Sequence, residues 1–175
     1  MPAPLIRFAA AADIPAITAI YGEAVRNGTA TFETDPPDAA EMESRWRRLI
    51  DGGYPYLVAD NGGVLGYAYA GPFHARAAYA HTVEDSVYLE AGARGTGVGT
   101  ALLTALIAEA EARGYRQVIA AIGDSANAAS IRLHARCGFR PVGTYRDVGW
   151  KLGRWLDVVL MQRQLGPGGG SPPKH

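Results

Sequence analysis

The sequence predicts a single α/β domain in which a mixed, mostly antiparallel sheet is flanked by helices. Three observations support this prediction. Segments with apolar residues at helical spacing alternate with short strand-like segments. Consecutive strand candidates in the middle of the chain have short connections, which is typical of antiparallel pairing. The 175 residues suit one compact domain, predicted over residues 1–165, and the Gly/Pro-rich tail 166–175 is expected to be flexible.

The N-terminal half is expected to hold one strand, two helices and a hairpin. Asp13 is expected to cap the first helix, which has Pro15 in its first turn and ends at Asn27-Gly28. Asp38 is expected to cap the second helix, which stops at Gly52-Gly53. A strand is expected at residues 5–8 and a loop at residues 29–37. The two strands of the hairpin are expected at residues 56–60 and 64–70.

The C-terminal half is expected to add the central strand, a glycine-rich turn and two more helices. The turn leads into an apolar helix that ends at Gly114, and residues 147–155 are expected to form an excursion between the last two strands. A loop is expected at residues 71–80 and a helix at residues 127–137. Strands are expected at residues 82–89, 117–122, 140–145 and 156–164. Alternation along the central strand gives it two faces, Glu84, Ser86 and Tyr88 on one and Val83, Val87 and Leu89 on the other.

The composition excludes several classes of protein. Lys plus Arg and Asp plus Glu balance at 17 each, so no general attraction to nucleic acid or anionic lipid is expected. No apolar run approaches the ~20 residues of a membrane span, and no secretion signal is visible. The single cysteine, Cys137, excludes an internal disulfide and is expected to be a small packed residue. A cytoplasmic protein is therefore expected.

The most informative stretch is the glycine-rich turn between the central strand and the apolar helix. Glycines let the backbone approach a ligand closely, and the free N–H groups of the first helical turn attract phosphate. The glycines of residues 94–99 are spaced G-x-G-x-G, which differs from the Rossmann fingerprint, and no P-loop motif is present. The turn therefore predicts a pyrophosphate site, to which Arg94 and the Thr100 hydroxyl could add charge and a donor.

Two blocks of sequence resemble the GNAT acetyltransferases. Residues 94–99, Arg-Gly-Thr-Gly-Val-Gly, are similar to the R/Q-x-x-G-x-G/A signature of that family. Asn127, Ser130 and Gly138-Phe139 are similar to its next block. The resemblance implies the GNAT fold with a splayed central sheet, acetyl-CoA as co-substrate, and a set of residues that bind it: Val87, Leu89, Arg94, Gly95, Thr96, Gly97, Val98, Gly99, Thr100, Asn127 and Ser130.

Further stretches resemble the phosphinothricin/methionine sulfoximine acetyltransferase branch of the family. They carry rarer motifs than the CoA signature, at residues 31–34, 71–79, 82–88, 130–134 and 149–158. The resemblance implies transfer of acetyl from acetyl-CoA to the amine of a small amino-acid-like acceptor. It also implies a homodimer, and Trp150 and Trp155 are expected to pack a loop or a subunit contact.

Direct transfer to an amine needs a base, because an ammonium cannot attack a thioester. Glu84 lies on the central strand shortly before the turn, and the matching glutamate has this role in the family. For the leaving thiolate many GNAT enzymes use a tyrosine, whereas this branch has a histidine, here His134. His134 could relay protons or be a packed helix residue, and Tyr88 is another possible acid.

The acceptor's carboxylate is expected to be bound by arginine, which can donate two parallel hydrogen bonds. By resemblance, Arg76 and Tyr79 bind this carboxylate, Phe32 closes one wall of the pocket, and Glu84 meets the amine. No metal site is expected, because His74 and His81 lack ligand spacing.

Two alternatives remain open on the sequence. One is a GNAT enzyme for another amine, such as a protein N-terminus, a polyamine or an aminoglycoside. An aminoglycoside would need an acidic pocket, and the loop 71–80 has no acidic residue. The other alternative is a non-catalytic acyl-CoA-binding module, which would keep the turn without a reason to keep Glu84, Arg76 and Tyr79 together.

Overall fold

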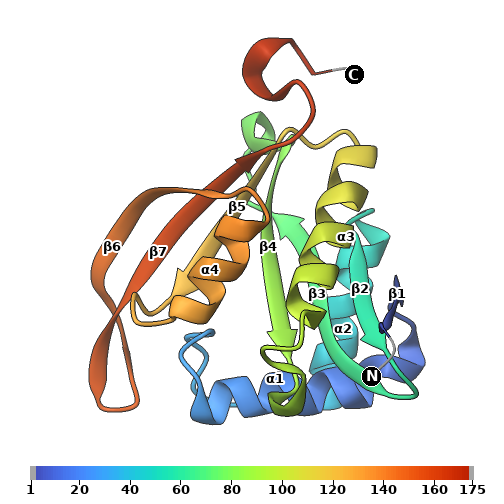
Figure 1. Ribbon diagram of the computed structural model, residues 1–175, viewed down its shortest axis with the longest axis vertical. Coiled ribbons are helices and arrows are strands. Elements are labelled where there is room, and N and C mark those ends of the chain that lie inside the picture. The colour runs from blue at the N-terminus through green and yellow to red at the C-terminus, as the bar shows by residue number, and fades with distance from the viewer. Residues whose placement is uncertain (1–2, 174–175) are drawn as a thin grey trace.

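The computed structural model describes residues 3–173, which form a seven-stranded sheet with helices on both faces (Figure 1). The strand order is β1-β2-β3-β4-β5-β7-β6, and within the described residues β4–β5 is the one parallel pair. The elements are β1 (Leu5–Phe8), α1 (Ile14–Asn27), α2 (Ala39–Asp51), β2 (Tyr56–Asp60), β3 (Val64–Pro72), β4 (Thr82–Leu89), α3 (Val98–Ala112), β5 (Gln117–Gly123), α4 (Ala128–Arg136), β6 (Arg140–Lys151) and β7 (Arg154–Gln164). The predicted α/β class with a mostly antiparallel sheet is confirmed.

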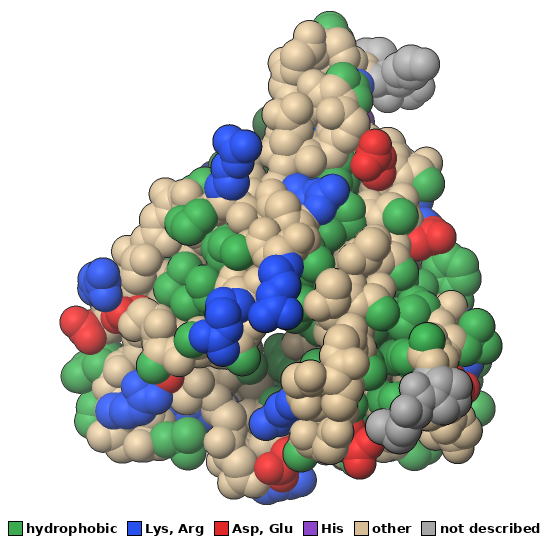
Figure 2. Space-filling view, viewed as in Figure 1, with side chains coloured by type: hydrophobic (Ala, Val, Ile, Leu, Met, Phe, Trp, Pro, Cys, Tyr) green, Lys and Arg blue, Asp and Glu red, His purple; other side chains and the backbone are tan. Residues whose placement is uncertain are grey.

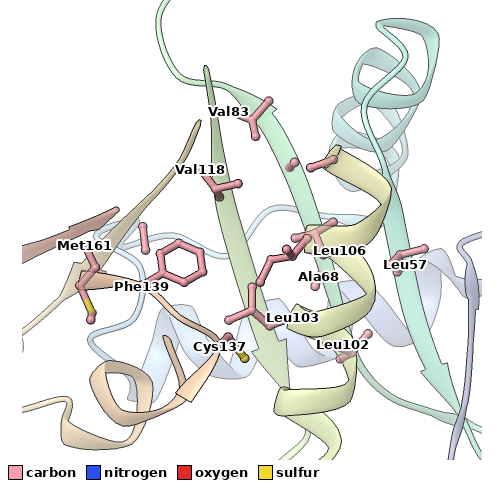
Figure 3. Close-up of a cluster of buried hydrophobic side chains, with 14 of the residues drawn as sticks. Leu57, Ala68, Val83, Leu102, Leu103, Leu106, Val118, Cys137, Phe139 and Met161 are labelled. Atoms are coloured by element: carbon pink, nitrogen blue, oxygen red, sulfur yellow. The ribbon is translucent and has the colours of Figure 1, made fainter. Parts of the chain in front are cut away.

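Two apolar clusters hold the layers together. On one face, Leu102, Leu103 and Leu106 of α3 are at most 1% exposed and pack against Val83 and other strand residues (Figure 3). On the other face, α1 and α2 pack against β2 and β3 around Ile17. Burying one such side chain stabilises the fold by about 1.5–3 kcal/mol. The alternation predicted for β4 is confirmed, since Val83 belongs to the first cluster and Tyr88 packs against the second.

One of the two predicted helix caps is wrong. Asp38 accepts a hydrogen bond from the Glu41 backbone N–H at 2.8 Å, as expected of an N-cap. Asp13 precedes α1 but makes no capping bond to that helix. Its carboxylate instead accepts hydrogen bonds from the Arg7 guanidinium at 2.7 and 2.8 Å and from the Ala10 backbone N–H at 2.8 Å. The carboxylate thus has a bidentate partner in β1, and the helical backbone angles of Asp13 (φ −84°, ψ −16°) differ from the extended angles typical of a capping residue.

The predicted excursion at residues 147–155 is wrong, because most of it belongs to a long β6–β7 hairpin. Leu152 and Gly153 have φ values of 51° and 73°, which makes them a two-residue hairpin turn of the kind that suits twisted strands. Trp150 pairs with Trp155 across the strands, and their rings are 5.3 Å apart in an edge-to-face arrangement. An irregularity between Tyr145 and Gly149 interrupts the pairing, which is why the strand pattern is hard to see in the sequence.

The chain beyond β7 is described up to residue 173. Leu165 is buried, Gly168–Gly170 form a short 3-10 turn, and the Arg116 guanidinium donates to the Gly168 carbonyl at 3.2 Å. Flexibility of the tail 166–175 stays a prediction, and residues 1–2 and 174–175 lie outside the described residues. Within the described part, no helix is both long and apolar enough to cross a bilayer.

Candidate active site in the gap between β4 and β5

The central strands separate where the sequence places its most informative motifs. The parallel pairing of β4 with β5 runs from Thr82 with Gln117 to Asp85 with Ala120 and is not continued beyond that point. β4 runs on to Leu89 and β5 to Gly123, so the C-terminal halves of both strands border an unpaired gap. A groove of about 560 Å³ and a smaller cavity of about 250 Å³ adjoin this gap. They share wall residues Ala30, Val87, Tyr88, Asn127 and Ser130.

The glycine-rich turn has the geometry of a phosphate cradle. Gly95 and Gly97 have φ values of 75° and 92°, a region that other residues rarely adopt, and a Cβ at either position would face open space. Val98 begins α3 directly after them, so the unbonded N–H groups of the first helical turn and the helix dipole point at the groove. The Thr96 hydroxyl donates to the Ala93 carbonyl at 2.6 Å and thereby holds the turn.

The large groove contains most of the residues predicted to bind the co-substrate. Val87, Leu89, Arg94, Gly95, Gly97, Gly99, Thr100, Asn127 and Ser130 line it. Thr96 and Val98 do not, since the Thr96 hydroxyl is used within the turn and the Val98 side chain is buried in the core. Arg132 and Arg136 from α4 add positive charge to the wall, and Figure 2 shows basic side chains around a hollow on this face. These residues suit a ligand that carries several phosphates.

A network of carboxylates fixes the loop that carries Asn127. The Asn127 side chain accepts a hydrogen bond from the Ser130 backbone N–H at 3.2 Å and so caps α4. Just before it, Asp124 has a φ of 72°, accepts from the Ala126 N–H at 2.9 Å and forms an ion pair with Arg154. Asp157 of β7 accepts from the Ser125 hydroxyl at 2.8 Å. The hairpin thus holds one wall of the groove in place.

Glu84 lies in the smaller cavity, as the sequence predicts. Its side chain is half-buried, and among residues 3–173 no side chain forms a hydrogen bond or ion pair with its carboxylate. Burial, and then the charge of neighbouring Asp85, raises the pKa of Glu84 above its ordinary value. A carboxylate with a raised pKa and no protein partner is available to take a proton from a ligand.

Tyr88 is placed between the two cavities but also packs into the α1–α2 side of the sheet. Its ring stacks on Tyr67 at 5.4 Å and meets the edge of Tyr21 at 5.1 Å. Burial, with smaller contributions from nearby tyrosines, raises the pKa of the Tyr88 phenol well above its ordinary value. The phenol therefore stays protonated at neutral pH.

His134 is buried at the base of the smaller cavity, and both of its ring nitrogens have partners. Nδ1 lies 2.8 Å from the Ser130 carbonyl oxygen, and Nε2 lies 2.9 Å from Oδ2 of Asp85. Burial alone would lower the pKa of His134, but the hydrogen bond with Asp85, its charge and the Ser130 carbonyl together raise it. These contacts fit the alternative that the sequence left open, in which His134 is a packed and hydrogen-bonded helix residue.

The ring of Phe32 lies between Gly123, at the end of β5, and Gly149 in β6. A Cβ on Gly149 would lie 2.2 Å from the Phe32 ring, and a Cβ on Gly123 would lie 3.0 Å from it. Beside it, the ammonium of buried Lys151 donates to the Thr31 carbonyl at 2.7 Å. Phe32 does not line the smaller cavity itself, whereas its neighbours Ala30 and Thr31 do.

Arg76 and Tyr79 are not brought to the cavity. Both are exposed in the connection between β3 and β4, where Tyr79 packs against Phe73 and His74 at ring distances of 5.6 and 4.9 Å. The cavity wall contains Glu84 and Asp85 and neither lysine nor arginine. The argument against an aminoglycoside acceptor used the lack of acidic residues in the loop 71–80, and that segment does not line this cavity. Among residues 3–173 no three His, Cys, Asp or Glu side chains gather as a metal site.

Sequence reasoning missed two features of the site. The first is Asp85, which alternation places on the core face of β4 between Val83 and Val87, where a carboxylate requires a partner. A carboxylate at a core position of the strand was the sequence signal that could have identified Asp85. The second is Arg136, whose place on the groove wall follows from the packing of α4 and has no local signature.

A glycine-turn phosphate cradle beside a carboxylate-bearing cavity, both at the opening of a splayed sheet, defines an acyl-CoA-dependent transferase. The chain belongs to the acetyltransferase (GNAT) family, whose family model matches residues 17–139. The expected family is thus confirmed.

Relatives of known sequence and structure support the expected branch. The chain is 53% identical to the phosphinothricin N-acetyltransferase of Alcaligenes faecalis, over 93% of this chain and 83% of that protein. It is 46% identical to an L-methionine sulfoximine/L-methionine sulfone acetyltransferase of Pseudomonas paraeruginosa, over 95% of this chain and 98% of that protein. The crystal structure of a phosphinothricin acetyltransferase from Sinorhizobium meliloti in complex with acetyl-CoA superposes with a TM-score of 0.96. It shares 47% identity and covers 99% of this chain and 94% of that one.

Proposed function

We propose that this enzyme transfers the acetyl group of acetyl-CoA to the amine of a small amino-acid-like acceptor such as phosphinothricin or methionine sulfoximine. The observation that carries the proposal is the junction of the groove and the smaller cavity at Val87 and Tyr88. A long phosphate-bearing ligand in the groove can reach the junction with its far end, and a compact amine in the cavity can meet it there. The names of the relatives support this acceptor class.

The groove residues divide the binding of acetyl-CoA between them. Backbone N–H groups at residues 95–100 face the pyrophosphate, and Arg94 adds charge. Val87 and Leu89 border the unpaired gap, so their backbone groups can bond the pantetheine arm as an added strand would. Asn127 and Ser130 stand at the junction, where the arm ends. The thioester supplies the acetyl group, and each of these contacts orients it toward the cavity.

Glu84 is the proposed base. The cavity has the carboxylates of Glu84 and Asp85 and neither lysine nor arginine on its wall, which favours an ammonium inside it. Glu84 takes the proton that the ammonium must lose before it can attack. Tyr88, which keeps its proton, is the better-placed donor toward the leaving thiolate, because neither N–H of His134 is free.

Phe32 supports the cavity wall from behind through Thr31. A role of Arg76 and Tyr79 in binding the carboxylate stays a prediction, since both lie outside this cavity.

The proposal includes a homodimer. It is supported by large apolar side chains that the β6–β7 hairpin leaves exposed: Val142, Tyr145, Val148, Trp150, Leu152 and Trp155. Light scattering should give twice the chain mass, and Trp150→Ser with Trp155→Ser should lower it. A cytoplasmic location also stays a prediction, supported by the single buried thiol of Cys137.

The test is acetyl-CoA-dependent thiol release with separate acceptors. Phosphinothricin and methionine sulfoximine should give higher kcat/KM than standard amino acids, spermidine or an aminoglycoside. Turnover confined to the other amines would remove the acceptor claim and keep the family. Binding of acetyl-CoA without turnover of any amine would favour the non-catalytic module.

A further inference from the structure

The buried contact between Asp85 and His134 joins residues 49 positions apart at the point where β4 and β5 separate. Their side chains are only 1% and 5% exposed. Asp85 is the last residue of β4 in the parallel pairing, and both residues line the smaller cavity with Glu84. A polar pair so deeply buried next to a reactive cavity has a cost that a purely apolar contact would avoid.

The hydrogen-bond partners determine where the protons are. The Ser130 carbonyl can only accept, so Nδ1 of His134, at 2.8 Å from it, carries a proton. Nε2 faces a carboxylate oxygen at 2.9 Å, and this short contact requires one further proton between the two atoms. That proton is either on the ring, which makes an ion pair, or on Asp85, which makes a neutral pair.

The surroundings favour the ion pair. From β4 the ring of His134 is faced by Asp85, from α4 by the uncharged Ser130 side chain and carbonyl, and from the residue just before β6 by the ring of Phe139, edge-to-face at 5.0 Å. No second cation among these groups competes for the carboxylate. Both ring nitrogens face acceptor oxygens, which stabilises a charged ring, and because Oδ1 of Asp85 has no hydrogen-bond partner among the described residues, His134 is the group that can stabilise a charge on this carboxylate.

We infer that Asp85 is a positioning residue of the acetyl-transfer site, which holds the His134 ring as a cation and places a fixed negative charge next to Glu84. The inference rests on the proposed role of Glu84 as base. It adds that the proton affinity of this base is set by a buried pair on the wall of the same cavity.

The charge on Asp85 acts on Glu84 in a direction that can be worked out. The titratable groups that face Glu84 are Asp85 on its own strand and Tyr69 on β3, which is itself influenced by Glu33 and Arg45 from the α1–α2 side. Tyr69 is neutral at working pH, since burial raises its pKa. Asp85 therefore supplies the nearby negative charge that makes Glu84 hold its proton more tightly, and removing that charge must make Glu84 a weaker base.

The variant Asp85→Asn keeps the size of the side chain and a hydrogen bond to Nε2, because an amide N–H can donate to a neutral imidazole. It removes the charge of Asp85 directly and, because the ring loses its counter-ion, the charge of His134 as well. NMR of ring-labelled histidine reports the charge of His134 directly, and the chain has only four histidines, so comparison with His134→Asn assigns the signal. The wild-type ring should be charged at pH 7, and in Asp85→Asn it should be neutral at the same pH.

The pH profile of kcat gives a second readout with the same acceptor in both proteins. The limb on which activity rises with pH should move to lower pH in Asp85→Asn, because of the two charges lost it is that of Asp85 that raises the pKa of Glu84. The matched control is Asp51→Asn at the exposed end of α2, which should leave both the profile and the His134 signal unchanged. Affinity for acetyl-CoA should be the same in all of these proteins.

A neutral His134 ring in the wild-type protein at pH 7 would overturn the inference. An unmoved limb in a folded Asp85→Asn protein would also overturn it. Should Asp85→Asn not fold, Asp85→Ser removes the same charge and gives the same test. Failure of Glu84 as base is distinguishable, because Glu84→Gln would then keep its turnover while the His134 signal stays as predicted.

Discussion

Replacing Glu84 with glutamine tests the proposed base with the least disturbance of the site. The change keeps the shape of a half-buried side chain that has no hydrogen-bond or ion-pair partner among residues 3–173, so no other contact is lost. Loss of general base catalysis should lower kcat by ~10²–10⁴, or roughly 3–5 kcal/mol in the activation barrier. The KM for acetyl-CoA should stay within about twofold, since Glu84 lines the smaller cavity and not the groove.

The assay is thiol release from acetyl-CoA with saturating phosphinothricin, followed from pH 5 to pH 9. In the wild type, the raised pKa of Glu84 means that the base is protonated and inactive at low pH, and that activity appears as pH rises through that pKa. The variant should lose this rise of kcat with pH. The control is Glu90→Gln, an exposed glutamate just after β4, which should behave as wild type. A kcat for Glu84→Gln within threefold of wild type would refute the reasoning.

Two further predictions concern the walls of the site. Gly149→Ala should displace Phe32, because the new Cβ would lie 2.2 Å from the ring. We expect the free energy of unfolding, measured by thermal unfolding, to fall by about 1–3 kcal/mol and the KM for the acceptor to rise. Gly143→Ala on the same strand has no atom within 4 Å of its Cβ and should show neither effect. Arg136→Gln should raise the KM for acetyl-CoA more at low salt than at high salt, whereas Arg140→Gln, outside the groove wall, should not.

Much of the fold could be predicted because local patterns and tertiary packing agree. Apolar spacing predicts the four helices, and Asp38, Asn127 and the glycines after the helices mark their ends. The hairpin at residues 140–164 was misread because charged and glycine residues interrupt its alternation near Gly149. Its turn also uses Leu152 in a left-handed conformation that this residue type rarely adopts. Asp13 was misassigned because its partner, Arg7, lies in a different element.

The site could be predicted to the extent that it depends on a continuous motif. The turn at residues 94–99 and the position of Glu84 on β4 are both local features, and the structure places them at the same gap. The contact of Asp85 with His134 depends on α4 packing across the open sheet, so spacing along the chain does not show it. For the same reason the sequence could not show that Arg76 lies outside the cavity.

The central claim is that the enzyme acetylates the amine of a small amino-acid-like acceptor, and a one-pot competition tests it most directly. Phosphinothricin, methionine sulfoximine, spermidine and a short peptide with a free N-terminus would be mixed at equal concentration with limiting acetyl-CoA. Mass spectrometry of the early products gives the ratio of their kcat/KM values. Acetylated phosphinothricin or methionine sulfoximine should be the dominant product; acetylated peptide or spermidine in excess of both would show that the enzyme acts on another class of amine.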